Sequence, residues 1–178
     1  MAAQEHETAV VVPVPDVEPV ISAWRDQFDS SAAQGMPAHV TALYPFLPAD
    51  RFGAQALTRL RRLCAERPIL KVEFRRAARF PGVLYLEPEP SDGLRQLTLE
   101  IAGQWPEAPP YRGAFSEIIP HLTVVHGVAP DVLDMIDAHV LRSLPITTPL
   151  VEARLYVFDG ERWWMRARLP FHPHSRNG

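Results

Sequence analysis

Hydrophobic positions along the chain follow two periods, which predicts a fold that mixes strands and helices. Some segments alternate apolar and polar residues every second position, as a half-buried strand does. Others repeat apolar residues every three or four positions, as an amphipathic helix does. Strands are expected at 8–14, 38–44, 69–76, 83–87, 118–126, 151–158 and 163–169, and helices from Pro15, over 54–66, after Ser91 as N-cap and from Pro130.

The order of these elements repeats, because each half reads strand, helix, strand, helix, strand. The third element of each half contains His39 or His121, which are 82 positions apart, as are Ile69 and Val151 at the start of later strands. No long identity accompanies the repeat. We expect an α+β fold of two antiparallel-type sheets, related by a pseudo-twofold axis, flanked by helices and enclosing a central cleft. We expect one domain over 1–178, with half 1 at about 8–80, half 2 at about 81–171 and a tail at 172–178.

Composition limits the classes of protein that the chain can belong to. At 178 residues with 47% hydrophobic content, it can bury one ordinary core. Its net charge of −3 excludes a general positive field for duplex DNA. Basic residues do gather between positions 59 and 79, either on solvated faces of a helix and a strand or as a local landing area for RNA. They are Arg59, Arg61, Arg62, Arg67, Lys71, Arg75, Arg76 and Arg79.

The single cysteine and the termini predict a protein of a reducing compartment. Cys64 lies among leucines at helical spacing, so we expect a buried core residue and no disulfide. The N-terminus lacks the pattern of a signal peptide, and no segment approaches the ~20 apolar residues of a membrane helix. We therefore expect a cytoplasmic monomer that does not bind membranes.

A His-x-Thr tripeptide occurs three times, and two copies share a wider context. His39/Thr41 and His121/Thr123 each follow a nearby proline, lie on an apolar strand and precede a helix. The third copy, His6 with Thr8, lies in a polar terminus, and we do not assign it to a site. In a strand, histidine and threonine two positions apart share one face, about 6.6 to 6.8 Å apart.

This pair of motifs indicates chemistry at a phosphodiester. Two imidazoles that titrate near neutral pH can remove one proton from a nucleophile and deliver another to the leaving oxygen. Threonine hydroxyls on rigid strands can donate hydrogen bonds to the charged phosphate oxygens without a metal. We therefore predict His39 and His121 as catalytic residues, Thr41 and Thr123 as phosphate-binding residues, no metal ligands and no cofactor. Motifs of serine hydrolases, zinc proteases and Gly-rich phosphate loops do not occur in the sequence.

The segments HVTALYPF and PHLTVVHG resemble the paired signature motifs of the two-histidine (2H) phosphoesterase superfamily, in its 2′-5′ RNA ligase-like and cyclic phosphodiesterase branch. The resemblance extends to FPGVLYLEPEPSDGLRQL and to VFDGERWWMRARLPF. It implies a bilobal fold and a hydrolase or ligase that acts on 2′,5′ or 2′,3′-cyclic linkages of an RNA-derived nucleotide or RNA end. It also implies that His39 and His121 are the acid/base pair and that Thr41 and Thr123 bind the phosphate.

The resemblance fails at one position. Family members often carry a basic residue, commonly Arg, five positions after the second histidine, and this chain has His126 there. A neutral imidazole anchors phosphate less strongly than a guanidinium does. In a regular strand, the odd spacing from His121 would turn His126 to the opposite face.

Other aromatic and histidine residues stay open to more than one interpretation. Eight aromatic residues could stack on a base or belong to the core or rim. They are Tyr44, Phe46, Phe80, Tyr85, Tyr111, Phe115, Trp163 and Trp164. His139 is expected to be structural, and His172 and His174 to lie in a surface tail. The alternative function is a noncatalytic module that binds RNA ends or a nucleotide in the same cleft.

Overall fold

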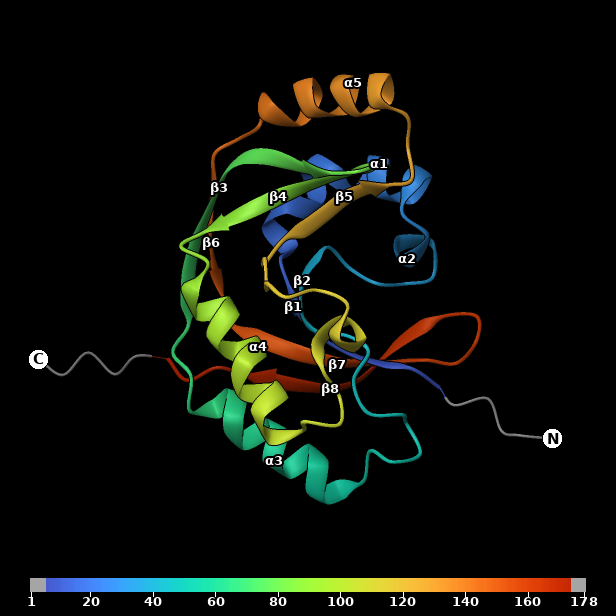
Figure 1. The fold of residues 1–178 in the computed structure, drawn as a ribbon. Helices are drawn as coiled ribbons and strands as arrows, with labels where there is room; N and C mark the ends of the chain where they lie inside the picture. The colour runs from blue at the N-terminus through green and yellow to red at the C-terminus, as the bar shows by residue number, and fades with distance from the viewer. Residues whose placement is uncertain (1–5, 174–178) are drawn as a thin grey trace, which may run out of the picture.

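The computed structural model describes residues 6–173, whose strands form one antiparallel sheet with the order β6-β3-β4-β5-β2-β1-β7-β8. The sheet curls, so that its two ends lie in different directions (Figure 1). The strands are β1 (Thr8–Pro13), β2 (His39–Leu43), β3 (Leu70–Phe80), β4 (Val83–Glu89), β5 (Leu122–His126), β6 (Ile146–Leu150), β7 (Glu152–Phe158) and β8 (Trp163–Pro170). The order places β2 and β5, the strands of the two motifs, side by side at the centre.

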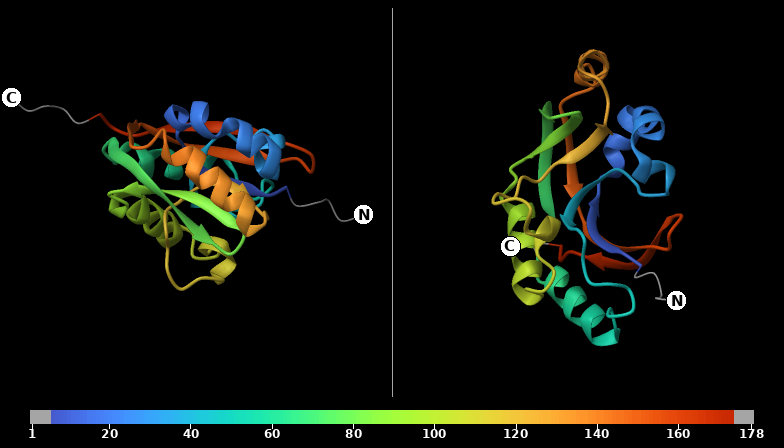
Figure 2. Two further views of the ribbon diagram at one scale, coloured as in Figure 1. Left: turned by 90° about the horizontal axis from the view of Figure 1, so that it is seen from above. Right: turned by 45° about the vertical axis from the view of Figure 1, so that its right-hand side comes forward.

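The helices form two groups at opposite ends of the molecule, as the right-hand view of Figure 2 shows. One group packs against β3, β4 and β5, and the other packs against β2 and β8. The first group is α1 (Glu18–Phe28), α2 (Ser30–Ala33) and α5 (Pro130–Leu141), and the second is α3 (Ala54–Ala65) and α4 (Asp92–Gln104). Two short 3₁₀ helices, η1 (Pro15–Val17) and η2 (Pro110–Gly113), complete the described elements. No helix within residues 6–173 is both long enough and apolar enough to cross a bilayer.

Alternation along β1 separates a core face from a second face. Val10 and Val12 are fully buried in the large hydrophobic core. Ala9 and Val11 belong instead to a smaller buried cluster that also contains Met36. Burying one such apolar side chain stabilises the fold by about 1.5–3 kcal/mol. The period-two pattern of the sequence therefore leaves one face of the sheet to the core and the other to a candidate site.

The expectation of two sheets is wrong, because the two groups of strands join into one sheet between β2 and β5. The joint consists of one paired position, Val40 with Leu122. Both side chains are buried, with 1% and 0% of their surface exposed. Leaving strand edges unpaired at such a buried position would cost the hydrogen bonds of their backbone groups. The sequence suggests separate sheets because its order of elements repeats, and the single paired position that joins them leaves no mark in that order.

Several boundaries also differ from the prediction. The edge strand β6 is missed because Pro149 breaks its pattern, and an edge strand tolerates proline since one side of it has no partner. Strand β5 begins at Leu122 rather than at 118, because Pro120 cannot donate to a ladder. His172 is not in a free tail, since its N–H donates to the Arg67 carbonyl at 2.7 Å. The predictions for the first residues of the chain and for His174 lie outside the described residues.

Candidate active site

The pairing of β2 with β5 brings the two His-x-Thr motifs together. Val40 lies opposite Leu122, and both point into the core. Continuing this antiparallel register by one residue in each direction places His39 opposite Thr123 and Thr41 opposite His121. The four side chains thus share the face away from the core, where cross-strand neighbours have Cβ atoms about 4.5–5.5 Å apart. We call these four residues the His-Thr quartet.

The two histidines of the quartet make the same backbone contact. Nδ1 of His39 lies 2.7 Å from the carbonyl oxygen of Pro37, and Nδ1 of His121 lies 2.7 Å from that of Ile119. A carbonyl only accepts, so Nδ1 carries the proton and donates it in both rings. In the neutral imidazole this leaves Nε2 with its lone pair, and both rings therefore present a base to the site.

The surroundings of both imidazoles disfavour their charged forms. Burial lowers the pKa of His39 from 6.5 to about 4. The hydrogen bond to Pro37 opposes this shift, and the nearby Arg25 and His121 lower the pKa further by smaller amounts. Burial also lowers the pKa of His121, again opposed by its backbone hydrogen bond. An anion bound between the rings would favour an imidazolium. Two neutral bases at neutral pH can thus become one acid and one base when phosphate binds.

Both motif strands contain a β-bulge directly after the threonine. The register of β2 with β1 shifts at this point, and Ala42 and Leu43 are both buried. The same shift occurs in β5, where Val124 and Val125 are both buried. An extra residue reverses the alternation of a strand. The residue five positions after each motif histidine therefore returns to the face of the quartet.

This bulge corrects the prediction for His126. On β4, Val83 is paired with His126 and Tyr85 is paired with Thr123. Val83 and Tyr85 are two positions apart, so they lie on the same face of the sheet. Its side chain is exposed. His126 thus lies on the quartet's face of the sheet, and the expectation that it turns away is wrong because the strand is not regular. In the other half, the equivalent residue is Tyr44, which lines a pocket with His39 and Thr41.

A strained segment places Tyr111 beside Thr41. Tyr111, Arg112 and Gly113 have consecutive positive φ angles of 51°, 56° and 75°, and such strain clusters at functional sites. The segment is fixed because the Tyr111 N–H donates to the Tyr44 carbonyl at 2.7 Å. Burial raises the pKa of Tyr111, and hydrogen bonding to the Thr41 side chain opposes this. The sequence gives no signal for this contact, since left-handed backbone is rare outside glycine.

Glu7 holds the same segment from outside through one ion pair and one hydrogen bond. Glu7 accepts a hydrogen bond from the Tyr44 hydroxyl at 2.5 Å and another from Arg112 at 3.0 Å. Burial and the Glu7 carboxylate raise the pKa of Tyr44 to about 12. Tyr44 is therefore a neutral hydrogen-bond donor at neutral pH.

The two sides of the quartet differ in the space that they leave. Beside His39 and Thr41 lies a pocket of about 310 Å³, with Met36 and Trp163 in its wall. Beside His121 the equivalent region is occupied by Phe80 and Tyr85, which stack at 4.3 Å and contact the His121 ring edge-on at 5.3 and 5.4 Å. The remaining candidate aromatic residues have other contacts: Phe46 is in the core, Phe115 packs on Tyr111, and Trp164 lines a different pocket.

The basic segment between positions 59 and 79 is largely neutralised. Five of its arginines form ion pairs with Asp or Glu, and Arg59 lies over the Trp105 ring and bonds Gln104. The five are Arg62, Arg67, Arg75, Arg76 and Arg79. This pairing weakens the case for a positive landing area for RNA.

Other candidate residues lie away from the quartet. Thr8 points into the core and donates to the Leu47 carbonyl at 2.6 Å, so the third His-x-Thr copy is not part of the site. Cys64 is fully buried, as predicted, and burial raises the pKa of its thiol to about 12. His139 packs edge-on against Trp24. Within residues 6–173, no three His, Cys, Asp or Glu side chains are grouped to hold a metal ion.

Comparison with known proteins gives consistent matches. The model of the family described as the 2′-5′ RNA ligase superfamily matches residues 13–162. A curated protein of Geobacillus kaustophilus, named "Putative phosphoesterase GK0864", is 26% identical over 119 residues, which are 65% of this chain and 65% of that protein.

Solved structures share the fold at low sequence identity. Escherichia coli LigT in complex with NADP⁺ has a TM-score of 0.61 at 17% identity, with 96% of this chain and 99% of LigT covered. The protein TT0787 of Thermus thermophilus has a TM-score of 0.60 at 17% identity, with 95% and 100% covered. The curled antiparallel sheet with its helices is therefore a LigT-like α+β fold.

Proposed function

The chain belongs to the 2′-5′ RNA ligase superfamily of 2H phosphoesterases, and from this premise we propose that it is a metal-independent enzyme acting on 2′,5′ or 2′,3′-cyclic phosphodiester linkages. The observation that carries the proposal is the His-Thr quartet, in which two neutral imidazoles and two hydroxyls share one face of two paired strands. The substrate class is an RNA end or an RNA-derived nucleotide. E. coli LigT, which shares the fold, has a structure in complex with 3′-AMP.

In the proposed reaction, each member of the quartet has one role. Nε2 of one imidazole removes a proton from water, whose oxygen forms the new bond to phosphorus. The imidazolium of the other histidine donates its proton to the ribose oxygen as the P–O bond breaks, so the ring of the cyclic phosphate opens to a monoester. Thr41 and Thr123 donate hydrogen bonds to the two non-bridging oxygens, which carry negative charge throughout.

His126 and Tyr111 extend this arrangement. The ring N–H of His126, on the quartet's face, can donate to a phosphate oxygen in the position where family members often carry arginine. The Tyr111 hydroxyl lies beside Thr41 and can donate to the threonine oxygen, which leaves the single hydroxyl proton of Thr41 for the phosphate. Preorganised donors avoid the cost of reorienting during the reaction.

We also propose that residues 1–178 are one domain built by duplication into two lobes. From the centre outward the sheet reads β2-β1-β7-β8 in one direction and β5-β4-β3-β6 in the other. The matching bulges in β2 and β5 support the same origin. The quartet then lies on the axis that relates the lobes.

Turnover of a 2′,3′-cyclic nucleotide, followed by separation of product, tests the proposed function. We expect a nucleoside monophosphate to form at an unchanged rate in the presence of a chelator, because no step uses a metal. A panel with 2′,5′-linked dinucleotides identifies the preferred linkage. Saturable binding without product on every substrate would instead support the noncatalytic module that binds RNA ends or a nucleotide.

The pH dependence of turnover reports on the histidine pair. Acid inactivates the pair by protonating the base, and alkali inactivates it by deprotonating the acid. Since burial lowers the pKa of His39 to about 4 and that of His121 below 6.5, we expect kcat/KM to be bell-shaped with its maximum between about pH 4 and 6.5. The maximum of kcat should lie at higher pH, because bound phosphate stabilises the imidazolium. A flat profile across this range would contradict two-histidine catalysis.

A further inference from the structure

The backbone before each motif histidine is held by an arginine, and the contact is the same in both halves. The Arg25 guanidinium donates to the Met36 carbonyl at 3.1 Å, three residues before His39. The Arg95 guanidinium donates to the Ile118 carbonyl at 3.2 Å, three residues before His121. The next carbonyl along the chain, in each case, is the one that accepts the Nδ1 proton of the histidine.

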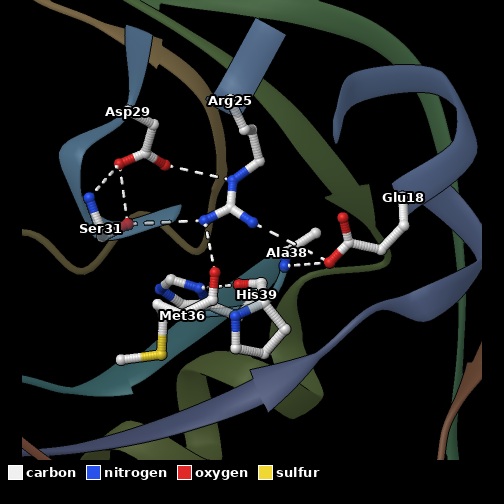
Figure 3. A network of polar contacts seen from close by, with 8 residues as sticks. Glu18, Arg25, Asp29, Ser31, Met36, Ala38 and His39 are labelled. Carbon is white, nitrogen blue, oxygen red and sulfur yellow. Dashed lines mark hydrogen bonds and ion pairs between the residues drawn. The ribbon is translucent and has the colours of Figure 1, made fainter. Parts of the chain in front are cut away.

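Each arginine is itself fixed by a carboxylate and a serine. Arg25 on α1 donates to Asp29 at 3.1 Å and to the Ser31 hydroxyl at 3.5 Å (Figure 3). Arg95 on α4 donates to Asp92 at 2.9 Å and to the Ser91 hydroxyl at 3.4 Å. A guanidinium presents five donors in a rigid plane, so one side chain can satisfy all these acceptors at once.

In the first half, the arginine is buried and Glu18 also binds the backbone before the histidine. Arg25 has only 2% of its surface exposed. The N–H of Ala38, which belongs to the same peptide group as the Pro37 carbonyl, donates to Glu18 at 2.5 Å (Figure 3). The peptide that accepts the His39 proton is therefore anchored directly.

In the second half, that direct anchor cannot form. The carbonyl of Ile119 shares its peptide group with Pro120, which has no N–H to donate. Residues 118–121 also lie in no helix or strand, so no ladder fixes them. Among the described residues, Arg95 supplies the side-chain donor to the backbone of this segment, through the Ile118 carbonyl.

We propose that Arg25 and Arg95 are positioning residues, which hold the carbonyls before His39 and His121 so that Nδ1 keeps its proton and Nε2 stays aimed at the quartet. This inference rests on the proposed function for its effect on turnover, and on the geometry alone for its effect on the histidine tautomer. It predicts that Arg95 acts on His121 without touching the substrate.

Arg95→Gln tests the proposal, with Arg79→Gln as the matched control. The two arginines have nearly equal side-chain exposure, 37% and 38%, and both pair with Asp residues. Arg79 ties β3 to α5 through Asp134 and Asp137, and neither of these residues lies in the segment before His39 or His121. Both variants are expected to fold, because neither arginine is buried.

The first measurement is the ¹⁵N spectrum of the His121 ring at neutral pH. In the unchanged protein and in Arg79→Gln we expect one protonated and one unprotonated ring nitrogen, with well-separated shifts. In Arg95→Gln the two shifts should move toward each other, because the tautomers mix when the Ile119 carbonyl is no longer held. An unchanged His121 spectrum in Arg95→Gln, or an equal change in both variants, would overturn the proposal.

The second measurement is steady-state turnover. We expect Arg95→Gln to lower kcat by about 10- to 100-fold, the scale on which misplacement of a catalytic group acts, with KM changed less than about twofold. Arg79→Gln should leave both constants unchanged. If the unaltered protein turned over no phosphodiester, the proposed function would fail, and the His121 spectrum would still decide the positioning role.

The same reasoning applies to the buried half through Arg25→Lys. Lysine keeps a charge near Asp29 but lacks the planar fork that reaches Asp29 and the Met36 carbonyl together. We expect the tautomer of His39, measured in the same way, to change less than that of His121 in Arg95→Gln. Glu18 still anchors the Pro37 peptide. An equal or larger change at His39 would show that the Glu18 anchor does not contribute.

Discussion

Replacing either His39 or His121 by glutamine is expected to lower kcat by about 10²- to 10⁴-fold, the usual contribution of a general acid or base. Glutamine is of similar size and its amide can still donate to the Pro37 or Ile119 carbonyl, so the local backbone should persist. It does not titrate, so it can neither accept nor deliver a proton. Steady-state and single-turnover assays on a 2′,3′-cyclic nucleotide measure the effect.

The double variant and a control separate catalysis from stability. If the two imidazoles act as one acid/base unit, removing both should cost little more than removing one. His139→Gln is the control, because His139 is an exposed histidine on α5 that contacts Trp24 and Arg142 and no quartet residue. Full activity in both single variants would rule out the assigned acid/base pair.

Much of the candidate site could be predicted from the sequence because it depends on local pattern. Period-two alternation places histidine and threonine on one face, and this holds as long as the strand is regular. The two motifs could be paired because their contexts match in each half. The structure adds the cross-strand register, which comes from Val40 and Leu122, two residues with no chemistry of their own.

The features that could not be predicted depend on departures from regular geometry. Nothing in the sequence marks the bulges that turn Tyr44 and His126 back to the face of the quartet, since Ala42 and Val124 are ordinary strand residues. The contact of Tyr111 with Thr41 requires a left-handed backbone at a bulky residue, which is a strained conformation that only the surrounding contacts can maintain.

The sequence pattern also does not predict polar contacts between residues that are far apart along the chain. Arg25 has the spacing of an exposed residue on an amphipathic helix, yet it is buried because four acceptors from α1, α2 and the segment before β2 surround it. Burying a charge is tolerated only when such partners are present. Sequence spacing gives the face of a helix and cannot give the acceptors that another segment brings to it.

Replacing either threonine of the quartet is also expected to have a large effect on turnover. Thr41→Val and Thr123→Val should each lower kcat by about 10²- to 10³-fold, as the loss of one donor to a transition-state oxygen does. Valine has nearly the shape of threonine and suits a strand, so the sheet should be preserved. The serine variants at both positions keep the hydroxyl and should retain most of the activity.

Stability distinguishes the two threonines. Thr41→Val removes a hydroxyl partner of the half-buried Tyr111, so it should also cost about 0.5–1.5 kcal/mol in the free energy of unfolding, and Thr123→Val should cost less. Thr147→Val, at an exposed position of β6, is the control for exchanging threonine and valine in a strand. Denaturant unfolding and turnover are measured on the same preparations. If Thr41→Val and Thr123→Val behaved like Thr147→Val in turnover, the hydroxyls would not bind the phosphate, and the two imidazoles alone would have to account for catalysis.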